Sequence, residues 1–327
     1  QFEAGNTGAP FTIGSEAALD LGGTAPTSLC NHNNVTTGGG GNDDFNYTTS
    51  TTLPVAYPKG FNAFYVMKYE CTQGQYVDFL NMLSAAQAIA RFAGMSPFTG
   101  VSGLTIDDTG TAPEVYVTTT PERAAGFLGT VDMMAYADWA ALRPMTELEY
   151  EKACRGNRPA VANEYAWGMV SVRSTQYTVT ASGASNETVN AIGTEGNANV
   201  PPIVQPAQPL RSGVFAGSLV SPDRQASGAG YYGAMELSGN MDERTISIGS
   251  AVARAFTGTN GDGSLTVAGI ADVAGWPTTG NPVSLRGSGF NNASAPLTNR
   301  LRVSSRLLPN QATSGSSDSG IRLCRLP

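Results

Sequence analysis

Histidine is almost absent from this chain of 327 residues, in which only His32 is found. Iron, copper and zinc catalysts usually need two or three imidazole or thiolate ligands in one site. The sequence therefore excludes a metal centre built on histidine. A Ser-His-Asp triad would have to recruit His32, and no G-x-S-x-G motif accompanies it. We expect His32 to be a solvated loop residue.

Charge is also scarce. Charged residues make up 14% of the chain, with 19 basic and 26 acidic side chains and a net charge of −7. Only three lysines occur, Lys59, Lys68 and Lys152, so no basic stripe can follow a phosphate backbone. No apolar run approaches the roughly 18 residues that a membrane-spanning helix needs. We therefore expect neither a nucleic-acid partner nor membrane insertion.

Cysteine occurs four times, at Cys30, Cys71, Cys154 and Cys324, without a C-x-x-C pair or zinc-finger spacing. Two disulfides are the economical interpretation, with three possible connectivities, and four reduced thiols of a cytosolic protein are the alternative. The few lysines, the acidic charge balance and the many Thr, Ser, Asn and Gly residues favour an oxidising compartment. Because the chain begins at Gln1, we expect a secreted or cell-surface protein that has lost a signal or pro-segment, a trimmed chain being the alternative.

The chain divides into a short first segment and a long remainder. Residues 1–60 are rich in Gly, Thr and Asn, and the pattern changes at residue 61. Alternation over Phe64–Tyr69 then indicates a strand. Thr72 predicts an N-cap, and apolar residues at helical spacing predict one helix that runs to about Phe92. We expect residues 1–60 to be a loop-rich strand segment of the same domain as residues 61–327.

Two further helices are predicted. One covers about Val131–Leu142 and ends before Pro144, because the residue before a proline disfavours the helical region. The other begins with a capping box of Thr146 and Glu149 and ends at Gly156 in the left-handed position.

The remaining segments contain few helix signals. Residues 93–129 predict a long excursion with a short hairpin, and the chain beyond residue 157 predicts loops and short strands. The acidic group Glu147, Glu149 and Glu151 lies on the first turns of the third helix, where capping and the helix dipole explain it better than acid/base chemistry does. The sequence thus predicts an α+β fold with about three helices.

Blocks in one order over residues 60 to 325 resemble a known family. They are Phe64–Glu70, Leu142–Gly156, Tyr232–Asn240, Arg286–Ser288 and Gly320–Arg322. Together they resemble the formylglycine-generating (sulfatase-modifying factor) domain, and in their finer wording the secreted versions common in Bacteroidota. The resemblance implies a C-type-lectin-like α+β fold with short antiparallel sheets and little regular structure.

The resemblance does not carry its catalytic chemistry over. Oxidising members use a cysteine pair after an R-G-G-S-W motif to bind copper, whereas Arg286–Arg306 contains no cysteine and the motif reads R-G-S-G-F here. Relatives that use iron require a histidine cluster, which one histidine cannot supply. We therefore expect a pseudo-enzyme without copper, iron or zinc.

The same resemblance implies roles for the cysteines. Family members often join the cysteine at the end of the third helix to one in the terminal strand, which corresponds to Cys154 and Cys324. The remaining pair is then Cys30 with Cys71. Each closed loop would stabilise the fold by roughly 3 to 5 kcal/mol in the chain-entropy model.

A calcium site is also implied. In the family a G-N-x-W-E turn binds calcium through its Asn and Glu side chains, and here the turn is Gly239–Glu243. Asn240 and Glu243 keep the oxygen ligands that calcium prefers, and Asp242 replaces the tryptophan. The alternative is a simple hydrogen-bonded turn. Asp262 resembles a calcium loop only weakly, since D-G steps are ordinary turn residues.

Three functions remain open on the sequence alone. The first is a non-catalytic extracellular protein that builds or decorates a surface as a self-associating fibre, coat or adhesin subunit. Gln1–Gly5 resembles the middle of a family turn without its preceding strand, which would leave an edge free to pair with another chain. The second is a lectin-like module that displays the loop Phe290–Asn299 to a glycan or protein. The third is a copper-dependent oxidase.

Overall fold

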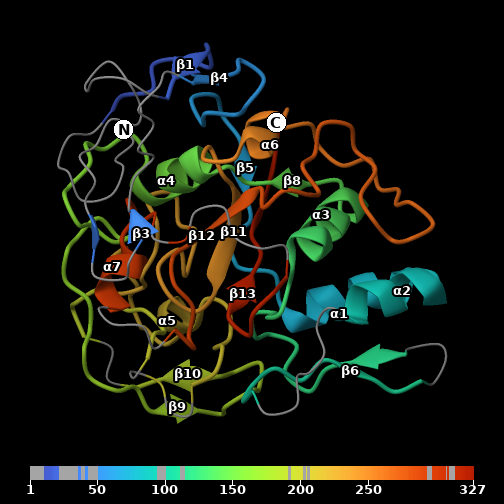
Figure 1. The fold of residues 1–327 in the computed structure, drawn as a ribbon. Helices are drawn as coiled ribbons and strands as arrows, with labels where there is room; N and C mark the ends of the chain where they lie inside the picture. Colours follow the sequence, from blue (N-terminus) through green and yellow to red (C-terminus); the bar gives the residue numbers. More distant parts are fainter. Residues whose placement is uncertain are drawn as a thin grey trace.

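The computed structural model describes residues 11–21, 36–37, 41–42, 51–93, 101–110, 115–190, 193–201, 204, 207–292, 297–306, 308 and 314–327. His32 and Cys30 lie outside these residues. In the described part the fold is α+β, with short helices around small sheets and long connections between them (Figure 1).

The described residues form seven helices, of which four have eight residues or more, so the expectation of about three was too low. They are α1 (Gln73–Met82), α2 (Ala85–Phe92), α3 (Thr130–Trp139), α4 (Glu147–Arg155), α5 (Val214–Gly217), α6 (Ala251–Arg254) and α7 (Leu297–Leu301).

The strands are short, and only β11 reaches five residues. They are β1 (Leu19–Asp20), β2 (Thr36–Thr37), β3 (Gly41–Asn42), β4 (Thr52–Leu53), β5 (Tyr65–Val66), β6 (Asp107–Asp108), β7 (Tyr116–Val117), β8 (Arg143–Pro144), β9 (Val179–Thr180), β10 (Thr188–Val189), β11 (Asp242–Ile246), β12 (Val283–Arg286), β13 (Ser319–Gly320) and β14 (Leu323–Arg325). The pair β6 and β7 is the hairpin expected between residues 93 and 129.

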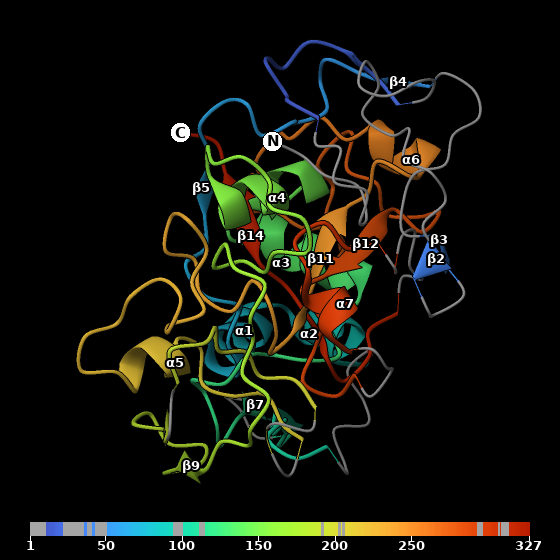
Figure 2. The ribbon, with the colours of Figure 1, turned by 90° about the vertical axis from the view of Figure 1, so that its left-hand side faces the viewer.

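Two three-stranded sheets organise the molecule. Their strand orders are β5-β14-β8 and β12-β11-β13, and the other strands form two-stranded pairs. The pairing is antiparallel except between β11 and β13, which are parallel. The last strand of the chain therefore lies in the middle of one sheet. Figure 2 shows β5 on the outer side of that sheet, with β14 further inside and α4 close by.

The single helix predicted to reach Phe92 is two helices. Leu83 is extended, with φ −82° and ψ 161°, and Ser84 starts α2 through a capping box with Gln87. The predicted Thr72 N-cap is confirmed, because its hydroxyl accepts a hydrogen bond from the Gln75 amide. Apolar spacing continued across the break, and the polar capping signal at Ser84 was the one that the sequence analysis overlooked.

The third predicted helix corresponds to α4, and its two ends lie where the sequence predicted them. Thr146 caps α4 and forms the capping box with Glu149, and Gly156 ends the helix with φ 66°. Its ψ of −134° lies outside the left-handed helical region, so Gly156 adopts a conformation that is open to glycine almost alone. The second predicted helix corresponds to α3 and ends at Trp139, before β8.

The largest core cluster joins the first segment of the chain to the rest. Leu21, Leu53 and Tyr57 are fully buried in the same cluster as residues of α1, α3 and β11. Within it, Phe79 packs against Tyr136 with ring centroids 5.4 Å apart. None of the helices among the described residues has the length and apolar character needed to cross a membrane.

Candidate functional site

The turn predicted to bind calcium leads into β11, but its side chains are engaged by protein groups. Asn240 Oδ1 accepts hydrogen bonds from Asn199 Nδ2 at 2.9 Å and from the Leu210 amide at 2.8 Å. The Asn240 Nδ2 group donates to Glu70. The side-chain amide of Asn240 thus makes three of its four possible hydrogen bonds with protein groups.

The two acidic residues of this turn pair with arginines instead of facing each other. Asp242 and Glu243 are consecutive in a strand, so their side chains leave on opposite sides. Asp242 Oδ2 lies 3.1 Å from Arg300 Nη2, and Glu243 Oε1 lies 3.1 Å from Arg322 Nη2. A guanidinium group takes the place of a cation at Asp242 and at Oε1 of Glu243, while the buried Oε2 of Glu243 has no hydrogen-bond partner among the described residues. The three predicted ligands therefore do not form one set, and this geometry does not fit the calcium site.

A different carboxylate group is close enough to hold a cation. Within the described residues it is formed by Asp138, Asp262 and Asp272. Asp138 accepts hydrogen bonds from the amides of Asp262 and Asp272 at 3.0 and 3.1 Å, and Asp262 Oδ1 accepts from Ser264. The bond between Asp262 and Ser264 is an ordinary turn contact, in line with the expectation that Asp262 is a turn residue, whereas Asp138 joins α3 to two distant loops.

The described cysteines are buried free thiols. Cys154 and Cys324 belong to one core cluster, yet no disulfide joins them in this structure, which differs from the predicted bond. Cys71 is also a free thiol, and its predicted partner Cys30 lies outside the described residues. Burial raises the pKa of Cys71 to about 12 and raises the pKa values of Cys154 and Cys324. None of the three therefore has the low pKa of a reactive thiol.

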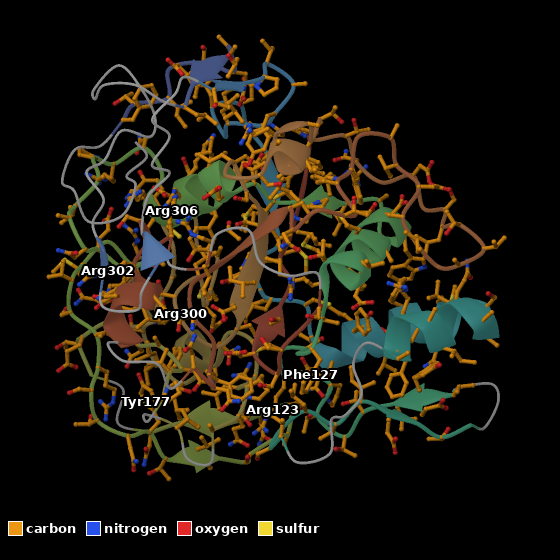
Figure 3. The ribbon with its side chains drawn as sticks, viewed as in Figure 1. Arg123, Phe127, Tyr177, Arg300, Arg302 and Arg306 are labelled. Atoms are coloured by element: carbon orange, nitrogen blue, oxygen red, sulfur yellow. The ribbon has the colours of Figure 1, made fainter. Side chains whose placement is uncertain are left out.

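The segment Arg286–Arg306, which lacks cysteine, contributes two arginines to a buried ionic cluster. Arg286 and Arg306 both contact Glu147 and Glu151 of α4. Figure 3 shows Arg306 close to α4, with Arg300 and Arg302 nearer to α7.

The ionic cluster gives two of the three acidic residues on α4 a role other than the predicted helix capping. Glu149 caps the helix and binds Arg143 bidentately, whereas Glu147 and Glu151 neutralise arginines from outside the helix. Burial alone would raise the pKa of Glu151, but Arg306, Arg155 and Arg286 outweigh it and lower this pKa to about 2. Capping therefore explains only Glu149, and the ion pairs of the other two were missed.

The loop proposed to display Phe290 to a ligand is only partly described. Phe290 is 1% exposed and packs in a core cluster with Leu104, Ala124 and Met241. Its amide donates to the Asn240 carbonyl at 2.8 Å. Phe290 is therefore a core residue, and residues 293–296 of the loop lie outside the described part.

An open groove lies elsewhere, around Tyr232. It consists of three adjoining hollows of about 380, 330 and 270 Å³. Tyr232 lines all three, Lys152 lines the first and second, and Val66 lines the second and third. We call this surface the Tyr232 groove. It runs from the first turns after Phe11 past α4 to the edge strand β5.

The Tyr232 groove gathers all three lysines of the chain. Lys59 is buried, and its ammonium donates to the carbonyls of Pro54 and Tyr57 at 2.6 and 2.9 Å. Lys152 donates to two backbone carbonyls, of which the nearer is that of Asn62 at 2.8 Å, so one of its three donors is left over. The exposed Lys68 ammonium lies 5.4 Å from the Tyr69 ring centroid. Two lysines therefore face the groove with positive charge to offer.

Aromatic side chains accompany the lysines. Phe61, Tyr65 and Tyr232 are 50%, 67% and 58% exposed, which is unusual for rings of this size. Lys152 Nζ also lies 5.3 Å from the centroid of the Phe64 ring. The groove thus combines apolar rings with cations, as binding surfaces commonly do.

A comparison with known protein families decides the relationship. The family described as the sulfatase-modifying factor enzyme 1-like domain matches residues 25–326, which is nearly the whole chain. The chain belongs to this family. No curated protein matches it.

Within this sulfatase-modifying factor domain, sequence reasoning found the family but missed the Tyr232 groove. Its walls come from residues near 60, 150 and 232, which no local pattern connects. One signal was available, because the three lysines of an acidic chain lie only in the segments that line it. The predicted strand around Tyr65 also carries apolar residues on both of its faces. Only one face of a strand at the edge of a domain packs on the core, so the aromatic residues of the other face were a second signal.

Proposed function

We propose that this member of the sulfatase-modifying factor family is a non-catalytic, secreted or cell-surface protein that acts by binding, with the Tyr232 groove as its contact surface. The proposal includes the finer family expectations, namely the C-type-lectin-like form of the fold and the secreted Bacteroidota-type origin. It involves no copper, iron or zinc chemistry.

One observation carries the proposal. Residues 286–306, where catalytic relatives hold their cysteine pair, instead supply Arg286 and Arg306 to the buried ionic cluster on α4. A thiolate nucleophile or copper ligand must be accessible and of low pKa. Cys71, Cys154 and Cys324 are buried thiols with raised pKa values, which supports a structural role for them.

Self-association into a fibre or coat is a second candidate. The outer side of β5 favours it, because no strand among the described residues pairs there and an unpaired edge can accept a strand from a second copy. Negative-stain microscopy of the native protein separates the two versions. Discrete particles support the binding protein, and ordered filaments support the assembly subunit.

The absence of catalysis has its own test. We expect the protein, incubated with copper(I), oxygen and a cysteine-containing peptide, to leave the peptide unchanged in mass spectrometry. A relative that carries the cysteine pair is the positive control under the same conditions. Conversion of the peptide cysteine to an aldehyde by this protein would overturn the proposed function.

A further inference from the structure

We propose that the Tyr232 groove binds an extended acidic peptide of a partner protein, which adds as a strand to the free edge of β5. This inference rests on the binding role proposed above and specifies its ligand class. Three features carry it: a side of β5 with no paired strand among the described residues, the three lysines of a chain with a net charge of −7, and a row of adjoining hollows.

The first feature is the free edge of β5. The Met67 amide donates to the Leu323 carbonyl at 2.9 Å, which places Met67 and Tyr65 in hydrogen-bonded positions toward β14. In an antiparallel ladder, the residues between them turn their N–H and C=O groups to the other side. The backbone of Val66 therefore faces away from β14, and Val66 lines two of the hollows. Further along the same side, the Lys68 carbonyl accepts a hydrogen bond from the Met235 amide at 2.8 Å, so the described residues leave this edge open at Val66 and close it at Lys68.

The second feature is charge. The chain carries a net charge of −7, yet all of its lysines line the groove. Glu149 pairs with Arg143, whereas Glu16 accepts from the neutral amides of Lys59 and Asn62 and its charge acts on Lys59 and Lys152. Lys68 and the remaining donor of Lys152 are left for a ligand. An acidic segment complements this patch, whereas a basic or neutral one does not.

The third feature is the row of hollows. Side chains on one face of a strand recur about 7 Å apart, so an added strand directs several side chains of that face toward the row of hollows. Phe64 and Ala153 line the second hollow, and Ala234 and Met235 line the third. A neutral glycan could stack on Tyr232, but it would leave the Val66 backbone and the lysines without partners. The edge and the charge together favour a peptide.

The test uses the whole protein and defined peptide probes. The probes are an array of hexapeptides with valine, phenylalanine and glutamate in varied order, so that apolar and acidic side chains can share one face of the strand, and the same array with glutamine in place of glutamate. We expect binding of the glutamate peptides only, weakened by added salt because the charges are partly exposed. Equal binding of both arrays would overturn the role of charge and with it the proposal.

Backbone pairing is tested on the ligand, so that protein folding is not at issue. The strongest peptide is N-methylated at alternate amides, in two complementary sets. If the peptide forms a strand on β5, one set loses binding by about tenfold or more and the other set keeps it. Equal effects of both sets would overturn strand addition.

The site is tested with variants of one exposed lysine. We expect Lys68→Glu to weaken binding of the acidic peptide about tenfold and Lys68→Arg to retain it. Arg173→Glu, a charge reversal in the segment before β9, is the matched control and should leave binding unchanged. Thermal unfolding of each variant verifies the fold. Unchanged binding by Lys68→Glu would overturn the proposed location.

The failure of this inference can be told from the failure of the proposed function. Glycan binding or self-association without peptide binding overturns the peptide and leaves a non-catalytic binding protein in place. Aldehyde formation in the copper assay overturns the proposed function itself.

Discussion

Three buried glutamates share a single arginine in the middle of the fold. Glu243 pairs with Arg322, Glu70 accepts from Asn240 and from the Met241 amide, and both oxygens of Glu236 accept from the Gly213 amide. Burial raises the pKa of Glu236 to about 7 and that of Glu243 to about 8, and the pKa of Glu70 is also raised. The three carboxyls therefore do not all ionise at neutral pH.

Glu236→Gln should remove the pH dependence of the unfolding free energy that the Glu236 carboxyl causes. The folded pKa of Glu236 is about 7 and its ordinary value is 4.5, so its contribution to stability is complete below pH 4.5 and is lost as the pH rises to 7. The loss amounts to about 3 kcal/mol from the shift between the two values. We expect wild type, compared with the variant, to lose roughly this much unfolding free energy between pH 4.5 and pH 8 in urea titrations.

Three charged groups act on the carboxyl group of Glu236. Arg322 and Arg211 favour its ionised form, and Glu70 lies nearby. A variant Glu236→Gln whose stability falls with pH as steeply as wild type would contradict the assignment.

Elements are predictable where their signals are local. Thr146, Glu149 and Gly156 lie within one short segment, and the structure confirms both ends of α4 that they predicted. The break between α1 and α2 was missed, because apolar spacing hid the cap at Ser84. Glu151 pairs with Arg155 within α4, but Arg286 and Arg306 lie more than 100 positions away, so the sequence of α4 alone could not reveal these two partners.

Gly156→Ala should destabilise the end of α4. Gly156 has φ 66°, and a Cβ there would lie 2.1 Å from Cδ1 of Tyr231. Backbone strain and steric overlap act together, so we expect a loss of about 3 kcal/mol in urea unfolding. Gly110→Ala is the control, since Gly110 has φ 63° and no atom within 4 Å of its Cβ position.

The Gly110→Ala control separates the backbone strain from the steric overlap with Tyr231. Gly110→Ala keeps only the backbone cost and should lose about 1 kcal/mol. Adding Tyr231→Ala to Gly156→Ala should recover part of the larger loss, because the overlap is then gone. Equal losses in the two glycine variants would show that the contact with Tyr231 has no effect.

For the whole molecule, the family resemblance predicted more than the residue patterns did. Composition and periodicity gave α+β and the positions of α1, α3 and α4. The insertion of β14 between β5 and β8 joins residues near 65, 143 and 324, and no local pattern specifies such pairing. The arginine partners of the predicted calcium ligands were unforeseen for a related reason, since Arg300 and Arg322 reach the turn from distant segments. Long-range ion pairs are thus the features of this fold that local sequence patterns do not predict.

These ion pairs give the molecule a pH optimum. The pKa of Glu151 is lowered to about 2 from an ordinary value of 4.5, so its contribution is complete above pH 4.5 and is lost as the pH falls. The raised pKa values of Glu236 and Glu243 act in the opposite sense above pH 4.5. We expect the urea midpoint to be highest between about pH 4.5 and 5 and to decline on both sides.

Glu151→Gln tests the loss of stability that is predicted as the pH falls below 4.5. Between pH 5 and pH 3 the unfolded chain binds a proton at Glu151 and the folded chain does not, which costs wild type about 2 kcal/mol. The gap between wild type and variant should shrink by this amount over the same range. Since loss of a buried partner can itself prevent folding, carboxyl NMR of wild type provides a second measurement, in which one glutamate should titrate near pH 2. A wild-type stability that keeps rising from pH 5 to pH 8 would show that the carboxyls around Arg322 ionise freely, and that the opposing pH dependences of the two clusters are absent.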